Sequence, residues 1–212
     1  PFWQYPADTA THNSPPIRDT HMTDMSNVTA PQPYRINVEQ FQKMAAAGIF
    51  EPDERIELIE GEILTMAPIG LRHGYAVAAL GELLHESGLG KRAFLWSQSA
   101  LVMRPSTQLQ PDLMLLRRPR ERYREEQPSH SDVLLLIEVS DSTLGFDRKR
   151  KVPLYARYRI PEVWIVNLQD RCMEVFREPT EMGYAQLSVR QIGEPVMPVA
   201  FPDVQLAWGS IA

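Results

Sequence analysis

The sequence lacks the features that mark secreted, membrane-spanning or disulfide-stabilised proteins. Its single cysteine, Cys172, cannot form an internal disulfide. Because Cys172 lies in a strand-like run, we interpret it as a packing residue rather than a redox or metal-binding one. No apolar run approaches the roughly 18 to 20 residues that span a bilayer, and the first residues lack the pattern of a signal peptide. We therefore expect a cytoplasmic protein without membrane contact.

The chain also carries fewer positive than negative side chains. The chain has 22 lysine and arginine residues against 27 aspartate and glutamate residues, a net charge of −5. Proteins that coat nucleic acid through bulk positive charge need many such contacts to phosphate, so this class is excluded and any nucleic-acid contact must be local. The arginines between positions 117 and 124 form one basic cluster interrupted by acids. We interpret it first as a solvated loop and second as a phosphate-contacting surface.

The chain divides by composition into a short leader and one domain. Residues 1–33 are rich in Pro, Thr, Asn, Asp and His and show neither helical nor strand periodicity, which predicts a disordered leader. Residues 34–212 have the length and composition of a single globular domain. No internal repeat is found.

Periodicity predicts alternating helices and strands in this domain. Residues 37–48 indicate a short amphipathic helix on a sheet surface, 55–66 a strand, tight turn and strand, and 72–87 a long helix. Further strands are predicted at 93–103, 111–117, 163–167, 171–177, 184–192 and 204–208. Residues 118–130 indicate a loop, and Pro153 implies that the helix containing Tyr155 starts near 150 or is kinked.

The run Val133–Val139 is continuously apolar except for one acid, Glu138. Such a run indicates a central strand covered on both faces. An ionised carboxylate there is costly unless it is paired or bound to a cation. Asp112 begins a similar run after Pro111. Two acids at neighbouring strand ends can meet in space, so Asp112 and Glu138 predict a shared site.

Two converging carboxylates suit a hard divalent cation such as Mg²⁺ or Mn²⁺. Such a cation can bind a phosphate oxygen and activate water for phosphodiester hydrolysis. A cation that orients the water or phosphate is still needed. Lys151 fits because it follows Glu138 on the next helix, with Tyr155 one turn later. Lys149 is the nearest competitor but lacks this spacing to Tyr155.

At this point the motifs resemble a known family. The order of these residues is similar to that of the Uma-type restriction endonuclease family, a branch of the PD-(D/E)XK nuclease superfamily, over roughly residues 34–208. The positions that carry the resemblance are Glu57, His73, Pro111-Asp112, Glu138-Val139-Ser140, Asp147, Lys151, Tyr155, Pro161-Glu162 and Trp164.

The resemblance implies an α/β fold with a restriction-endonuclease-like core, a mixed β-sheet flanked by helices, and additional antiparallel strands. It also implies a metal site at Asp112 and Glu138, with the carbonyl of Val139 as a further ligand. Ser140 stands where the superfamily pattern has lysine, and Lys151 would supply that function from the next helix. Arg159 stands where similar proteins have glycine, which we expect to alter a turn and not the chemistry.

Each site residue has a structural alternative. Glu57 either completes the acidic site or pairs with an arginine, and His73 either approaches the metal or phosphate or is structural. Lys151 is otherwise a solvated helix lysine near Asp147. Tyr155 is interpreted as a packing residue whose hydroxyl orients Lys151.

The functional hypothesis is a metal-dependent endonuclease that hydrolyses phosphodiester bonds, with DNA as substrate. A homodimer would suit cleavage of both strands of a duplex. The rival hypothesis is a binding or assembly module that keeps the nuclease fold without activity, and a third is hydrolysis of another phosphate ester.

Overall fold

The computed structural model describes residues 31–209 and residue 211. The chain divides into two units, Pro1–Pro33 and Tyr34–Ala212, and the structure described below is that of the second unit. The predicted disordered leader falls almost wholly on residues 1–30, which lie outside the described residues.

A four-stranded antiparallel sheet lies near the start of the unit. Its strands β1 (Ile56–Ile59), β2 (Glu62–Thr65), β4 (Leu101–Met103) and β5 (Thr107–Leu109) run in the order β2-β1-β5-β4. Helix α1 (Val38–Ala46) begins after Asn37, which forms a capping box with Gln40. Val38 and Phe41 of α1 pack on Ile56, Leu58 and Val102. The predicted helix on a sheet surface and the predicted strand pair are confirmed.

A six-stranded mixed sheet forms the centre of the unit. It contains β3 (Phe94–Ser97), β6 (Leu113–Leu116), β7 (Val133–Ser140), β8 (Glu162–Asn167), β9 (Cys172–Thr180) and β10 (Gly183–Gln191), in the order β10-β9-β8-β7-β6-β3. Only β7 and β8 pair in parallel; the other neighbours are antiparallel. The predicted central position of residues 133–139 is confirmed.

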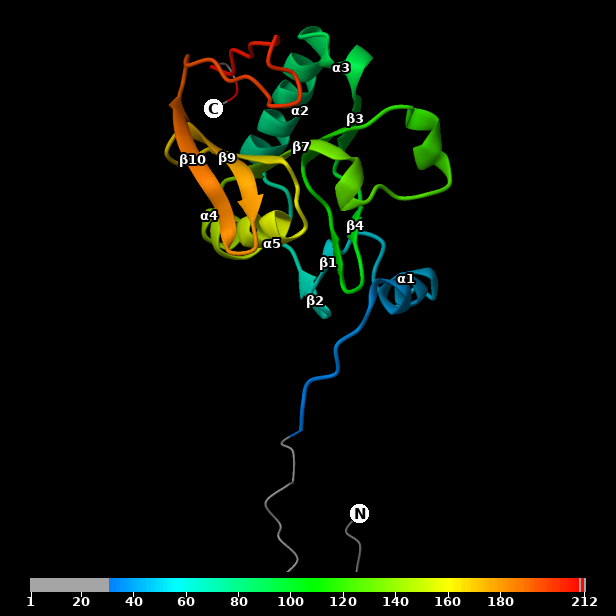
Figure 1. Cartoon of the computed structure of the whole chain (residues 1–212). Helices are drawn as coiled ribbons and strands as arrows, with labels where there is room; N and C mark the ends of the chain where they lie inside the picture. Colours follow the sequence, from blue (N-terminus) through cyan, green and yellow to red (C-terminus); the bar gives the residue numbers. More distant parts are fainter. Residues whose placement is uncertain (1–30, 210, 212) are drawn as a thin grey trace, which may run out of the picture. The chain divides into compact units, whose positions relative to one another are not determined.

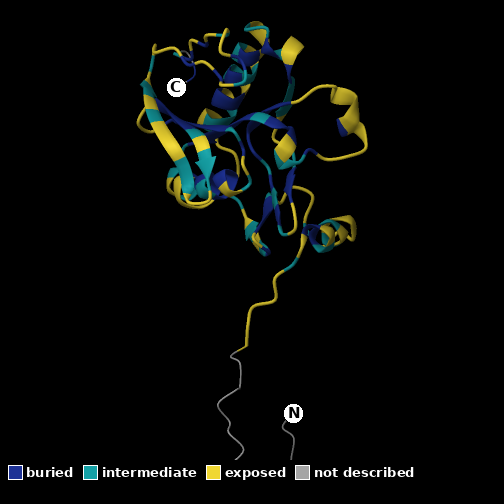
Figure 2. Cartoon of the chain, viewed as in Figure 1, coloured by how far each residue is buried: buried dark blue, intermediate teal, exposed yellow. Residues whose placement is uncertain are grey.

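Each face of this sheet carries its own apolar core. Helix α2 (Leu71–Glu86), short α3 (Leu89–Arg92) and the C-terminal segment cover one face, around Trp164 and Trp208. Helix α5 (Val152–Arg157) covers the other face, around Tyr155 and Ile165. Figure 1 shows α2 and α5 on opposite sides of the strands, and Figure 2 shows the buried strands between them. These two layers position the ends of β6 and β7.

The predicted strand at 93–103 is wrong as a single element. It divides into β3 and β4, which belong to different sheets. The break comes at Gln98, whose φ of 43° is incompatible with an extended strand. The loop at 118–130 likewise contains a short 3₁₀ helix, Arg120–Arg124, which buries Tyr123, and a second one, His130–Asp132, precedes β7.

The helix after β7 starts earlier than the prediction near residue 150. It runs from α4 (Leu144–Phe146) through a π-helical turn, Asp147–Lys151, into α5. Pro153 is the second residue of α5, which follows the π-helical turn. The wider turn faces both of its buried residues, Asp147 and Lys151, toward the same side of the helix.

Two further local features differ between sequence and structure. The predicted strand at 204–208 is only an isolated bridge between Val196 and Leu206, because Pro195, Pro198 and Pro202 remove the donors that a ladder needs. Arg159 adopts a φ of 59°, a left-handed conformation that glycine takes at lower cost. The turn continues directly into β8 without displacing the strand.

Candidate active site

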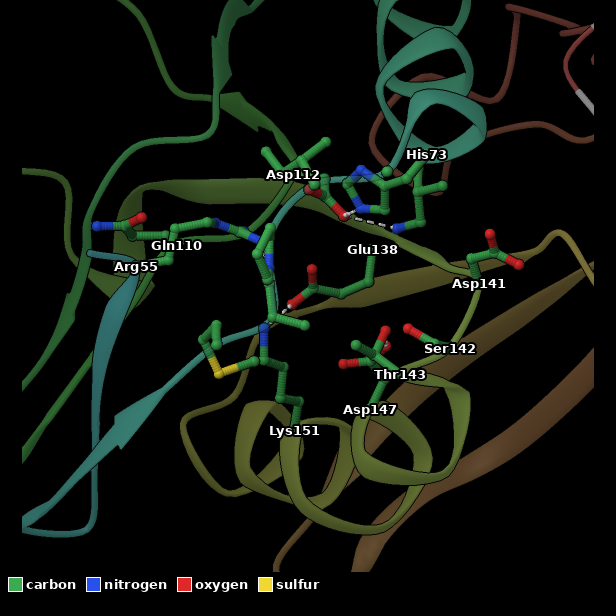
Figure 3. Close-up of a pocket in the computed structure, with 16 residues that line it drawn as sticks. Arg55, His73, Gln110, Asp112, Glu138, Asp141, Ser142, Thr143, Asp147 and Lys151 are labelled. Carbon is green, nitrogen blue, oxygen red and sulfur yellow. Dashed lines mark hydrogen bonds and ion pairs between the residues drawn. The ribbon is translucent and has the colours of Figure 1, made fainter. Parts of the chain in front are cut away.

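The two predicted acids lie at the same end of the central sheet. Asp112 directly precedes β6 and Glu138 lies near the end of β7; these strands are antiparallel, with Leu113 opposite Ile137. This register places Asp112 beside the last residues of β7. Asp112 is 4% exposed and Glu138 is 3% exposed. Figure 3 shows both carboxylates directed toward one cavity.

Asp112 is held by two donors through one oxygen. Its Oδ2 accepts a hydrogen bond from the backbone N–H of Val139 at 2.8 Å and contacts Nε2 of His73 at 3.1 Å. The carbonyl of Ser140 faces the opposite side, where it accepts from Leu168 N–H. Because backbone groups alternate sides along a strand, the carbonyl of Val139 faces the side of Asp112.

Lys151 bridges two acids from different sheets. Its Nζ is 3.2 Å from Oε1 of Glu57 in β1 and 3.2 Å from Oε1 of Glu138. Glu57 Oε1 also accepts from the backbone N–H of Gln110 at 2.9 Å, whereas its Oε2 is buried without a hydrogen-bond partner. Glu57 therefore contacts the lysine and not an arginine, and Lys151 is not a solvated helix lysine.

The hydroxyl of Tyr155 does not contact Lys151, contrary to the sequence interpretation. It donates to Glu138 Oε1 at 2.6 Å. The side chain is fully buried in the core beneath α5. Tyr155 therefore orients Glu138, an arrangement that helical spacing alone could not distinguish from contact with Lys151.

The site carries more negative than positive charge. Burial raises the pKa of Glu138 to about 8; Lys151 opposes this rise, while Asp112, Asp147 and Glu57 add to it. Burial disfavours the charge on Lys151, but Glu138 and Glu57 outweigh it and hold the pKa of Lys151 above its usual value. Burial together with Glu138 raises the pKa of Tyr155 well above 10. Additional positive charge would therefore stabilise the carboxylates.

Sequence reasoning missed the role of Asp147. The residue lines the same cavity, and its Oδ2 accepts hydrogen bonds at 2.7 Å from the hydroxyls of Ser140 and Thr143. Ser140 thus fixes an acid. The signal was present, because Asp147 precedes Lys151 by four positions.

The cavity has a volume of about 150 Å³. It is bordered by Asp112, Glu138, Asp147, Lys151 and His73, which come from the residue before β6, from β7, from the π-helical turn and from α2 (Figure 3). This volume is below the roughly 300 to 1,000 Å³ of pockets that enclose whole small molecules. It suits a phosphate group with a few waters better than a complete nucleotide.

The donor set fits a hard cation. Within residues 31–209 and residue 211, no group of three or more His, Cys, Asp or Glu side chains is arranged to hold a metal. Mg²⁺, however, is commonly bound through one or two carboxylates and keeps several waters. Asp112, Glu138 and the Val139 carbonyl supply oxygen donors of this kind, and the surplus of acids around one lysine favours a cation there.

Comparison with known families identifies the chain. The model of the Uma2 family, described as "Putative restriction endonuclease", matches residues 38–209. The chain belongs to this family. The resemblance drawn from the motifs is confirmed, and the matched region contains Glu57, Asp112, Glu138 and Lys151.

The Uma2 fold is also found among solved structures. The chain is similar to a crystal structure described as a putative nuclease belonging to DUF820 from Anabaena variabilis, with 14% identity and a TM-score of 0.63. The match covers 83% of this chain and 97% of that chain. The predicted α/β fold, a mixed sheet flanked by helices, is confirmed. No protein with a curated description matches the chain.

Family membership and fold together support a nuclease function and a nucleic-acid substrate for this Uma2 protein. No helix in the described part of the chain is long and apolar enough to cross a membrane.

Proposed function

We propose that this Uma2 protein is a Mg²⁺-dependent endonuclease that hydrolyses phosphodiester bonds in DNA, with Mn²⁺ as an alternative metal. The observation that carries the proposal is the convergence of Asp112, Glu138 and Lys151 on one cavity. Nuclease function agrees with the family and the fold.

Asp112, Glu138 and the carbonyl of Val139 would hold the metal. When bound, Mg²⁺ would supply Lewis-acid stabilisation of the phosphate and a water of lowered pKa. The Val139 N–H and His73 both contact Oδ2 of Asp112, which leaves Oδ1 of that carboxylate for the metal. His73 is therefore assigned to orienting Asp112.

Lys151 would orient the attacking water or the phosphate. Its ammonium contacts both Glu57 and Glu138, so Glu57 can retain it when Glu138 turns toward the metal. Tyr155 donates to the same Oε1 of Glu138 and so restricts that side chain. These contacts hold the charges of the site in fixed positions, and charges fixed in advance contribute to catalysis.

Cleavage of supercoiled and linear DNA in Mg²⁺ or Mn²⁺ tests the proposal. Wild-type protein should cut, whereas chelation by EDTA or the change Asp112→Asn should abolish cutting. Asp53→Asn, at an exposed position, is the matched control and should cut normally. Equal cleavage by the Asp112 variant would remove the assignment.

An inactive binding or assembly module is the second candidate, and the net charge of −5 favours it, since phosphate repels an acidic surface. Calorimetry with Mg²⁺ separates the two: an intact site binds metal through Asp112 and Glu138, and a decayed one does not. Homodimerisation would provide two sites for a duplex, and sedimentation analysis tests it.

A further inference from the structure

The catalytic cavity lies between two less polar grooves. On one side, a groove of about 320 Å³ separates α2 from the edge strand β3. On the other side, a pocket of about 220 Å³ lies between β2 and Phe146. The catalytic cavity shares Ile69 with the first and Met66, Ala67 and Thr143 with the second. The two less polar spaces are therefore neighbours of the cavity that the acids line.

One stretch of chain connects all three. Residues 64–67 border the pocket beside Phe146, residues 66–70 and His73 border the catalytic cavity, and Ile69 and Gly74 border the groove along α2. The same stretch exposes apolar side chains next to the cavity: Leu71 is 91% exposed and Tyr75 is 63% exposed. Along this stretch of chain, the pocket beside Phe146, the polar catalytic cavity and the groove along α2 follow one another.

The groove along α2 has the chemistry of a nucleobase site. Its walls are Val77 from α2, Leu95 from β3 and Leu113 from β6, and Gln98 and Ser97 provide polar groups at its border. Small residues on α2, Gly74, Ala78 and Gly81, keep it open. A base offers an apolar face and a hydrogen-bonding edge, and contacts to exposed bases are one of the ways in which proteins hold a single strand.

We infer that the substrate is single-stranded DNA, with the unpaired bases on either side of the scissile phosphate lying in these two grooves. The inference rests on the proposed nuclease function, because it takes the acids as the phosphate subsite. In a duplex the bases are stacked and paired, so neither groove could be filled unless bases were extruded. A net charge of −5 also suits a strand held through its bases better than a duplex with one charge per about 1.7 Å.

The change Gly81→Leu tests the groove without touching the acids. A Cβ at Gly81 meets no atom within 4 Å, and leucine has a higher helix propensity than glycine. The variant should therefore fold, which thermal denaturation verifies. His85→Leu adds the same side chain at an exposed α2 position outside the groove and serves as the control.

Binding is measured by fluorescence anisotropy with a labelled single strand, its RNA equivalent and the matching duplex, with Ca²⁺ replacing Mg²⁺ and intact oligonucleotide verified on a gel. We expect the wild type to bind single-stranded DNA at least tenfold more tightly than duplex. Gly81→Leu should lose at least tenfold in single-strand affinity, and His85→Leu should match the wild type.

Other outcomes overturn the inference. Equal or tighter duplex binding, tighter RNA binding, or unchanged single-strand affinity in Gly81→Leu would each do so. So would a change of oligomeric state in Gly81→Leu, since the groove beside the free edge of β3 would then be an interface between copies. Cleavage without a preference for single strands would refute the inference about the substrate but agree with the proposed nuclease function. Single-strand binding that depends on the groove, without cleavage, would refute the proposed nuclease activity but support single-strand binding in the grooves.

Discussion

Lys151 is the residue on which the proposed chemistry depends, since its ammonium contacts two of the acids, Glu57 and Glu138. The structure places it between Glu57 and Glu138, so its removal has two separable effects. Orientation of the water is lost, while the carboxylates remain available to a metal.

The change Lys151→Met is therefore expected to abolish DNA cleavage but retain Mg²⁺ binding measured by calorimetry. In the absence of metal, the two unpaired acids should lower the free energy of unfolding by about 3–5 kcal/mol, as for other broken buried ion pairs. Lys149→Met, on the exposed side of the same turn, is the control and should change neither quantity. Wild-type cleavage by Lys151→Met would eliminate the proposed role.

Glu138 should make metal affinity depend on pH. Because its pKa is raised to about 8, the carboxyl carries a proton over much of the range between its usual value near 4.5 and pH 8. Metal binding must displace that proton. The affinity for Mg²⁺ should thus fall as pH drops from 8 to 6 and level off above 8. A constant affinity across this range, measured by calorimetry, would contradict the assignment.

Tyr155 should stabilise the fold through its hydroxyl. Tyr155→Phe removes the donor to Glu138 Oε1 while preserving the buried ring. Above pH 8, where Glu138 is ionised, hydrogen bonds to charged groups contribute about 1.5–3 kcal/mol, and urea denaturation should show a loss of this size. Tyr75→Phe, at an exposed position on α2, should show none.

At the level of elements, the β1–β2 hairpin of the four-stranded sheet places Glu57 beside Lys151, which also contacts Glu138 in the six-stranded sheet. Its turn uses Glu60 and Gly61 with φ angles of 51° and 83°, the left-handed pair typical of tight hairpin turns. Gly61 also packs closely, because a Cβ there would lie 2.8 Å from Cβ of Arg35. The hairpin therefore requires glycine for both conformation and space.

Gly61→Ala should consequently destabilise the protein by more than Gly48→Ala. Both positions have positive φ, but a Cβ at Gly48 meets nothing within 4 Å. The Gly48 change should cost about 1 kcal/mol for backbone strain, and the Gly61 change should cost that amount plus the displacement of Arg35. Urea denaturation of the two variants provides the comparison, and equal losses would show that the close approach is tolerated.

For the molecule as a whole, local patterns predicted most elements but not their grouping into sheets. The alternation at 55–66 and the apolar run at 133–139 correspond directly to strands, because their periodicity reflects burial. The split at Gln98 was not predictable in this way, since both halves are apolar and only their partners differ.

Asp112 and Glu138 could be predicted for a physical reason, since charged groups in buried-type segments need partners, whereas Lys151 was predicted from its place on the following helix and its spacing to Tyr155. Which partner each one has depends on tertiary distances, so the contact of Tyr155 with Glu138 and the pairing of Lys151 with Glu57 required the structure. Asp147 was overlooked because a single acid in a polar, basic stretch resembles a solvated residue.

The central claim is that Asp112 and Glu138 form one metal site. Anomalous diffraction from crystals soaked in Mn²⁺ tests it most directly. The account predicts a peak within coordination distance of both carboxylates and the Val139 carbonyl, with Nζ of Lys151 retained by Glu57. A soaked crystal with manganese bound elsewhere and no peak between Asp112 and Glu138 would contradict it.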